Sequence, residues 1–200
     1  GYERGIREGV STRGGARVDP PLRRFFAVSD RVTSRPLMPN NTVDMLENGE
    51  EAYSRYCELA PDVVIMDLTM PGMGGLEASR RILAYDEKAR ILVFSVHENE
   101  VMLNRALDLG VLGYISKRSA SQVMVEAVRK VAAGEMYVGQ EMMPHLVKRA
   151  SSPDSELVSG LSPREFEVFR LLADSKSVND IAKLLNLSPK TVGHHMTHIK

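Results

Sequence analysis

The chain has 200 residues, 43% of them hydrophobic, and its 26 Lys and Arg balance 26 Asp and Glu. The apolar fraction can bury a core, so wholesale disorder is excluded, and the length suits one large domain or two small ones. The single cysteine, Cys57, excludes an internal disulfide, and no apolar run reaches the roughly 20 residues that span a bilayer. We therefore expect a soluble, cytoplasmic protein without a membrane partner.

The neutral total hides a charge gradient along the chain. Residues 1–40 carry a net charge of +4 from eight Arg and four acidic residues, whereas residues 41–150 carry −4 from sixteen acidic and twelve basic residues. Nucleic-acid binding depends on a local basic patch and not on the total charge. A neutral composition therefore leaves a nucleic-acid partner open.

The N-terminal residues 1–41 form an atypical segment. They show little periodicity, and paired glycines and several prolines interrupt them. Only Arg24–Val28 has the character of a short strand. We place this segment outside the domain that follows.

From Thr42 onward, strand and helix signals alternate. Continuous apolar runs predict buried strands, and apolar stripes at helical spacing predict the helices between them. The strands are expected at 63–66, 91–94 and 112–115, and the helices at 47–60, 76–83, 101–109 and 121–131. This alternation predicts an α/β domain over residues 42–145, with a parallel sheet covered on both faces.

Residues 146–160 are predicted to be a linker, because they are rich in Ser and contain Pro153 and Asp154. Strand signals then disappear. Ser162 and Glu165 form a capping box around a proline, and Ser177 and Ser188 repeat the start signal. Three short helices with tight turns predict a small all-α helix-turn-helix domain over residues 161–200.

Three polar residues fall at the carboxyl ends of the predicted strands, where open α/β sheets bind ligands: Asp67, Ser95 and Lys117. An Asp carboxylate can accept a phosphoryl group, a lysine can neutralise the added charge, and a hydroxyl can donate to a phosphoryl oxygen. Taken singly, each residue has a structural explanation without a site: Asp67 could cap a loop, Ser95 could end a strand, and Lys117 could be a solvated side chain. Their coincidence at one sheet edge favours a site.

The segment Pro61–Gly75 resembles the phosphoacceptor segment of two-component response regulators. The steps of 28 residues from Asp67 to Ser95 and of 22 from Ser95 to Lys117 also fit their receiver domain. Leu161–Glu165 together with Leu187–His195 resembles the LuxR-type DNA-binding domain. The pairing is similar to the NarL/FixJ subfamily, which implies a flavodoxin-like, doubly wound sheet followed by the helix-turn-helix.

The resemblance implies a role for each strand-end residue. Asp67 would accept a phosphoryl group from a histidine kinase, with Mg²⁺ bridging the carboxylate and phosphoryl oxygens. The backbone carbonyl of Thr69 would complete part of the metal shell. Ser95 would be the switch hydroxyl, Tyr114 the aromatic that changes rotamer, and Lys117 the phosphate partner.

The acidic pair that holds Mg²⁺ in receivers has no clear counterpart. Counting back about 45 residues from Asp67, as the resemblance implies, finds neither a pair nor a strand. Asp30 is the nearest candidate, because it follows the short strand, yet Pro36 and Pro39 would break a helix between it and residue 42. We therefore expect the first strand to be atypical or missing, leaving an exposed sheet edge and an incomplete metal site.

In the third C-terminal helix, Val192, Met196 and Ile199 follow the spacing of a packed face. By the resemblance, base-edge contacts fall at Gly193, His194 and Thr197, and Gly193 stands where a basic residue is usual. Lys190, Thr191 and Lys200 suit phosphate contacts, which position the protein without specifying sequence.

The resemblance implies a transcriptional regulator and not an enzyme, in which phosphorylation relieves inhibition. A histidine kinase and promoter DNA are the implied partners, and RNA polymerase is a further candidate. Family members dimerise through a fourth helix, and the sequence stops at Lys200 while the third helix is still running. We therefore expect weak, salt-sensitive DNA binding. The alternatives are a phosphorylation-independent regulator or interaction module, and a phosphatase that uses Asp67 as its nucleophile.

Overall fold

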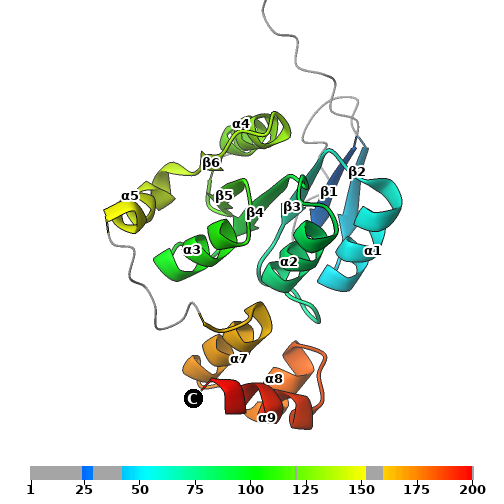
Figure 1. The fold of residues 1–200 in the computed structure, drawn as a ribbon, viewed down its shortest axis with the longest axis vertical. Coiled ribbons are helices and arrows are strands. Elements are labelled where there is room, and N and C mark those ends of the chain that lie inside the picture. Colours follow the sequence, from blue (N-terminus) through cyan, green and yellow to red (C-terminus); the bar gives the residue numbers. More distant parts are fainter. Residues whose placement is uncertain (1–23, 29–41, 120, 152–159, 200) are drawn as a thin grey trace, which may run out of the picture.

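A computed structural model describes residues 24–28, 42–119, 121–151 and 160–199. The chain forms an α/β part followed by a helical part (Figure 1). Among the described helices, none is long and apolar enough to cross a membrane.

Within the described residues, the sheet of the α/β part has six strands, all parallel, in the order β2-β1-β3-β4-β5-β6. Their bounds are β1 Arg24–Val28, β2 Thr42–Leu46, β3 Val63–Met66, β4 Ile91–Ser95, β5 Gly113–Ser116 and β6 Tyr137–Val138. The predicted doubly wound, parallel α/β fold is confirmed, and two of its strands, β2 and β6, had no clear signal in the sequence.

The expectation of a missing first strand is wrong. β1 lies between β2 and β3 and pairs with both, so the sheet begins before residue 42 and its first strand is central. The apolar run from Phe25 to Val28 suits this position, because a central parallel strand is buried on both faces. Residues 24–28 therefore belong to the α/β domain and not to a foreign segment.

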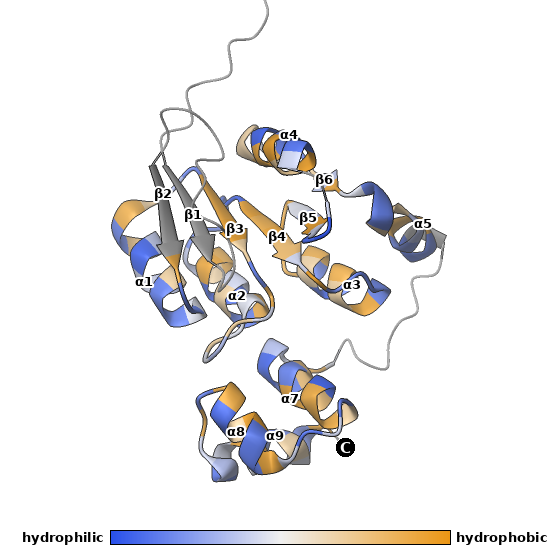
Figure 2. Cartoon of the chain, turned by 180° about the vertical axis from the view of Figure 1, so that it is seen from behind, coloured by the Kyte–Doolittle hydropathy of each residue, from blue (hydrophilic) through white to orange (hydrophobic). Residues whose placement is uncertain are grey.

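Helices cover both faces of the sheet. Their bounds are α1 Gly49–Leu59, α2 Gly75–Tyr85, α3 Glu100–Asp108 and α4 Ser121–Ala132. Alternate strand residues such as Val64 and Met66 pack with α1, α2 and α3, whereas Val63 and Ile65 pack with α4. Figure 2 shows the hydrophobic residues concentrated along β3 and β4, in the middle of these layers.

The predicted linker is partly helical. A short 3-10 helix, η1 Gln140–Met142, leads into α5 Met143–Ser151. Lys148 and Arg149 pair with Glu100 and Asp108 of α3, at 2.7 and 2.6 Å, which fastens α5 to the α/β part. The linker therefore begins later than the predicted residue 146, because these ion pairs extend the folded region.

The C-terminal part contains the predicted helix-turn-helix: α7 Pro163–Ala173, α8 Val178–Leu184 and α9 Pro189–His198. Each helix begins after a serine, Ser162, Ser177 or Ser188, whose side chain accepts a backbone hydrogen bond, and Ser162 and Glu165 form the expected capping box. Val192 is fully buried against α7 and α8, and Met196 and Ile199 pack beside it. The packed face predicted for α9 is confirmed.

Candidate functional site

Asp67 is held at the carboxyl end of β3 with its side chain buried. Its Oδ2 accepts a hydrogen bond from Nζ of Lys117, and its Oδ1 accepts one from the backbone N–H of Thr69 at 2.9 Å. The chain then turns back so closely that a Cβ at Gly75 would lie 2.0 Å from the carbonyl oxygen of Asp67. The glycine-rich loop therefore packs against the acidic residue that it follows.

Ser95, Tyr114 and Lys117 converge on the same edge of the sheet. The Oγ of Ser95 is buried and accepts a hydrogen bond from the backbone N–H of His97 at 3.1 Å. The hydroxyl of Tyr114, also buried, donates to the carbonyl of His97 at 2.7 Å. The backbone of Lys117 donates to the carbonyl of Ser95 at 2.8 Å. The three strand-end residues predicted from the sequence, Asp67, Ser95 and Lys117, thus lie in one cluster with Tyr114.

His97 borders this cluster, and a charge on α7 acts on its side chain. Its Nε2 lies 3.0 Å from Oγ1 of Thr69. Burial holds the pKa of His97 below its ordinary value, and Arg170 of α7 lowers it further, while Asp67 opposes them. The sequence alone could not show that Ser95 and Tyr114 both bind the backbone of His97, because Ser95 and Tyr114 lie on separate strands.

The residues described here supply only part of a Mg²⁺ site. Asp67 offers one carboxylate and Thr69 a backbone carbonyl, and within the described ranges there is no group of three acidic, His or Cys side chains that could hold a metal. Mg²⁺ in proteins is usually held by one or two carboxylates with waters or phosphate oxygens. β1 ends at Val28, in register with Met66, the residue before Asp67. Asp30, the predicted acidic ligand, lies outside the described residues.

The outward face of α9 carries most of the predicted DNA contacts. Lys190, Thr191, His194 and Thr197 are exposed and Gly193 is partly exposed, whereas Lys200 lies outside the described residues. Nothing lies within 4 Å of a Cβ built on Gly193, so this position has room for a side chain. The ring of His194 packs edge-on against that of His198, whose Nδ1 lies 3.0 Å from Glu165. Charge and hydrogen-bonding groups are thus available along this helix.

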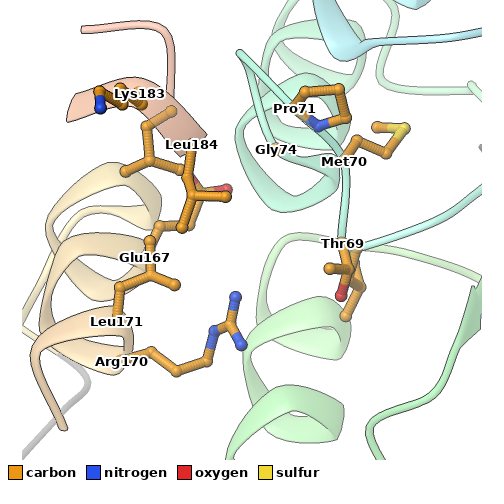
Figure 3. Close-up of a pocket in the computed structure, with 11 residues that line it drawn as sticks. Thr69, Met70, Pro71, Gly74, Glu167, Arg170, Leu171, Lys183 and Leu184 are labelled. Carbon is orange, nitrogen blue, oxygen red and sulfur yellow. The ribbon is translucent and has the colours of Figure 1, made fainter. Parts of the chain in front are cut away.

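The two domains meet at the loop after Asp67. A pocket of about 400 Å³ lies between Thr69, Met70 and Pro71 on one side and α7 and α8 on the other (Figure 3). In Figure 3, Arg170 extends across it toward Thr69. On α3, Nη1 of Arg105 donates to the carbonyl of Leu161 at 2.9 Å, and its guanidinium lies 4.1 Å from the ring centre of Phe166. The sequence held no signal for these contacts, since they join residues on either side of a linker.

Two family descriptions match the chain. The response regulator receiver domain matches residues 35–129, and the luxR family of bacterial regulatory proteins matches residues 159–200.

Two known proteins are similar to this chain. The transcriptional activator protein ExaE of Pseudomonas putida is 38% identical over 156 residues, which are 76% of this chain and 73% of that protein. A LuxR-family response regulator from Aurantimonas sp. SI85-9A1 is 30% identical, with a TM-score of 0.58 over 66% of this chain and 99% of its own.

RcsB from Salmonella enterica serovar Typhimurium, solved on a promoter with a phosphomimetic, has a TM-score of 0.56 at 24% identity and covers 89% of this chain and 90% of its own. At this identity the likeness concerns the fold alone. It extends over both the α/β and the helical part. The two family matches and the similarity to ExaE show that the chain belongs to the NarL/FixJ subfamily of two-component response regulators, which join a receiver domain to a LuxR-type helix-turn-helix domain.

Proposed function

We propose that this response regulator binds promoter DNA through α9 and that a histidine kinase controls the binding by phosphorylating Asp67. The observation that carries the proposal is the convergence of Asp67, Ser95 and Lys117 at the ends of three neighbouring strands, in a chain whose next domain is a helix-turn-helix. The ExaE relative is named as a transcriptional activator, which supports the same role here.

For phosphoryl transfer to Asp67, the main role of the protein is to position the reacting groups. An Asp67 carboxylate oxygen would attack the phosphorus of the kinase's phosphohistidine, forming a P–O bond as the P–N bond breaks. Lys117, already on Oδ2, would neutralise the added charge, which is about −1.5 to −2. Mg²⁺, held by Asp67, the Thr69 carbonyl and Asp30, would supply further positive charge. The chain therefore acts as the acceptor and not as an enzyme that turns over substrate.

The switch would start at Ser95. Its Oγ now accepts from the backbone N–H of His97, and Tyr114 donates to the carbonyl of the same residue. A Ser95 hydroxyl drawn toward the phosphoryl group would release the His97 backbone and loosen the hold on Tyr114. The face from Leu103 to Ala133 would then repack, freeing the DNA-binding domain to dimerise.

On DNA, the contacts proposed for α9 and for Lys200 after it divide by chemistry. His194, Thr197 and the position of Gly193 would face base edges, and Lys190, Thr191 and Lys200 would contact phosphates. A homodimer on two half-sites is the arrangement we propose, and RNA polymerase is a candidate partner for activation. Because few cations stand on this helix, we expect the affinity to be modest and sensitive to salt.

Fluorescence anisotropy with a DNA duplex selected by this chain from a random library tests the proposal. Acetyl phosphate with Mg²⁺ should raise the affinity of the parent chain and leave Asp67→Asn unchanged, while His194→Ala should weaken binding in both states. Equal affinity with and without acetyl phosphate would favour the phosphorylation-independent regulator. No DNA binding in either state would contradict the proposal.

A further inference from the structure

Glu167 of α7 is buried against the receiver domain. Its side chain is 7% exposed, and it packs on the glycine-rich loop that follows Asp67. A Cβ at Gly74 would lie 1.8 Å from Oε1 of Glu167, and the three nearest atoms to that Cβ all belong to Glu167. The absence of a side chain at Gly74 is therefore what allows the two domains to approach here.

Arg164 ties the same contact together. Its Nη1 donates to the carbonyl of Gly72 at 2.8 Å and to Oε2 of Glu167 at 2.7 Å, and its Nη2 donates to the carbonyl of Leu185 at 2.6 Å. The backbone N–H of Gly72 also donates to the carbonyl of Leu184 at 3.3 Å. One guanidinium thus joins the receiver loop, α7 and the end of α8.

The other oxygen of Glu167 is poorly satisfied. Among the described residues, Oε1 of Glu167 has no hydrogen-bond partner although it is buried. A buried carboxylate with one oxygen unpartnered is costly as an anion and much less so when protonated. The site is thus built for a carboxyl group that can carry a proton.

Charged groups on three helices lie around this carboxyl. Arg164 and Arg170 are on its own helix, Glu77 on α2 is held by Arg80 and Arg81, and Lys183 of α8 lines the adjoining pocket. Further along the same loop, Glu50 of α1 accepts from the backbone of Met73. Burial raises the pKa of Glu167 to about 7, with Glu77 adding to the rise and the two arginines opposing it. The removal of water from Glu167 therefore raises its pKa by more than Arg164 and Arg170 lower it.

We propose that Glu167 and Arg164 form a proton-operated latch, in which docking of the DNA-binding domain on residues 72–74 takes up a proton on Glu167. The latch goes beyond the phosphorylation switch proposed above, because it makes the docking of the two domains depend on pH as well as on phosphorylation. Acid would favour the docked state and alkali would release it.

The direction of the pH dependence follows from the linkage between proton binding at Glu167 and docking. Undocked, Glu167 faces water and its pKa returns toward the ordinary value of 4.5, whereas docked it titrates at about 7. The docking constant should therefore fall by up to about tenfold per pH unit between these values and stay level above them. His97 and His195 have pKa values below the ordinary value, so they act in the opposite sense as pH falls below 6.5. Only a comparison with a variant at position 167 isolates the latch.

The test is small-angle X-ray scattering of the full chain, without DNA or phosphoryl donor, between pH 5.5 and 8, comparing the parent with Glu167→Gln. The parent should pass from compact to extended, with a fall in the docking constant of about tenfold or more between pH 5.5 and 7. Glu167→Gln, neutral at every pH, should not open as the pH rises through this range. The same pH dependence in both proteins would overturn the proposal.

A glycine pair tests the contact itself. Gly74→Ala should open the chain at pH 5.5, because its methyl group would clash with Glu167, and the added change Glu167→Ala should relieve that clash. Gly160→Ala is the control, since nothing lies within 4 Å of a Cβ built there. An unchanged melting curve of the receiver domain confirms that it still folds. If Gly74→Ala stays as compact as Gly160→Ala, Glu167 does not dock at Gly74 and the latch is overturned.

Discussion

Nζ of Lys117 donates a hydrogen bond to Oδ2 of Asp67, 50 residues earlier in the chain, and the Asp67 side chain has no exposed surface. The pair joins the end of β5 to the end of β3 across β4. Since both groups are largely removed from water, the charge of each is stabilised by the opposite charge of the other. The same contact that places the acceptor therefore also stabilises the receiver.

Replacing Lys117 alone should be more harmful than replacing both partners. Lys117→Met leaves the Asp67 carboxylate buried without its ammonium, and we expect the free energy of unfolding to fall by about 3 kcal/mol. Asp67→Asn combined with Lys117→Met should recover most of this loss, because no charge is then buried. Urea unfolding of the three proteins gives the comparison, and a double variant as unstable as Lys117→Met would contradict it.

Ser95→Ala should separate phosphorylation from its effect. The hydroxyl that accepts from His97 is lost, while Asp67 and Lys117 keep their pairing, so acetyl phosphate should still modify Asp67 without raising DNA affinity. Mass spectrometry and fluorescence anisotropy on the same samples measure the two effects. Ser79→Ala, another fully buried serine, is the matched control and should respond like the parent. A normal rise in affinity in Ser95→Ala would remove Ser95 from the switch.

The strand-end residues and the capped helices could be predicted because their signals are local. Asp67, Ser95 and Lys117 each follow an apolar run, and Ser162, Ser177 and Ser188 each precede a helix. β1 also has an apolar run, but the prolines after it argued against the helix that follows the first strand in the family. Only the pairing of β1 with β2 and β3 shows that it is central. The contact of Glu167 with Gly74 had no local signal, because it is made between domains.

The stability of the receiver should depend on pH through His97. Its pKa lies below the ordinary value of 6.5, so the native state binds fewer protons than the unfolded state. The stability that this residue contributes is present above pH 6.5 and is lost as the pH falls. We expect His97→Gln to lose less stability than the parent between pH 7 and 5 in thermal melts. His145→Gln on α5 serves as the control, and a parent-like acid loss in His97→Gln would refute the assignment.

A basic residue at position 193 should strengthen DNA binding. Gly193 lies inside α9 with open space around it, so Gly193→Lys removes a glycine that costs up to about 1 kcal/mol in a helix and adds a cation facing DNA. The slope of log affinity against log salt should become steeper by about 1. Gly160→Lys adds the same charge away from α9. Equal gains in both variants would mean that α9 does not face the DNA.

Intact-mass spectrometry after incubation with acetyl phosphate and Mg²⁺ measures whether Asp67 accepts a phosphoryl group. We predict a gain of one phosphoryl group that hydroxylamine removes and that is absent from Asp67→Ala. Asp30→Asn should reduce the gain at low Mg²⁺, if Asp30 supplies the missing carboxylate. No mass gain in the parent chain, or an equal gain in Asp67→Ala, would show that Asp67 is not the phosphoacceptor.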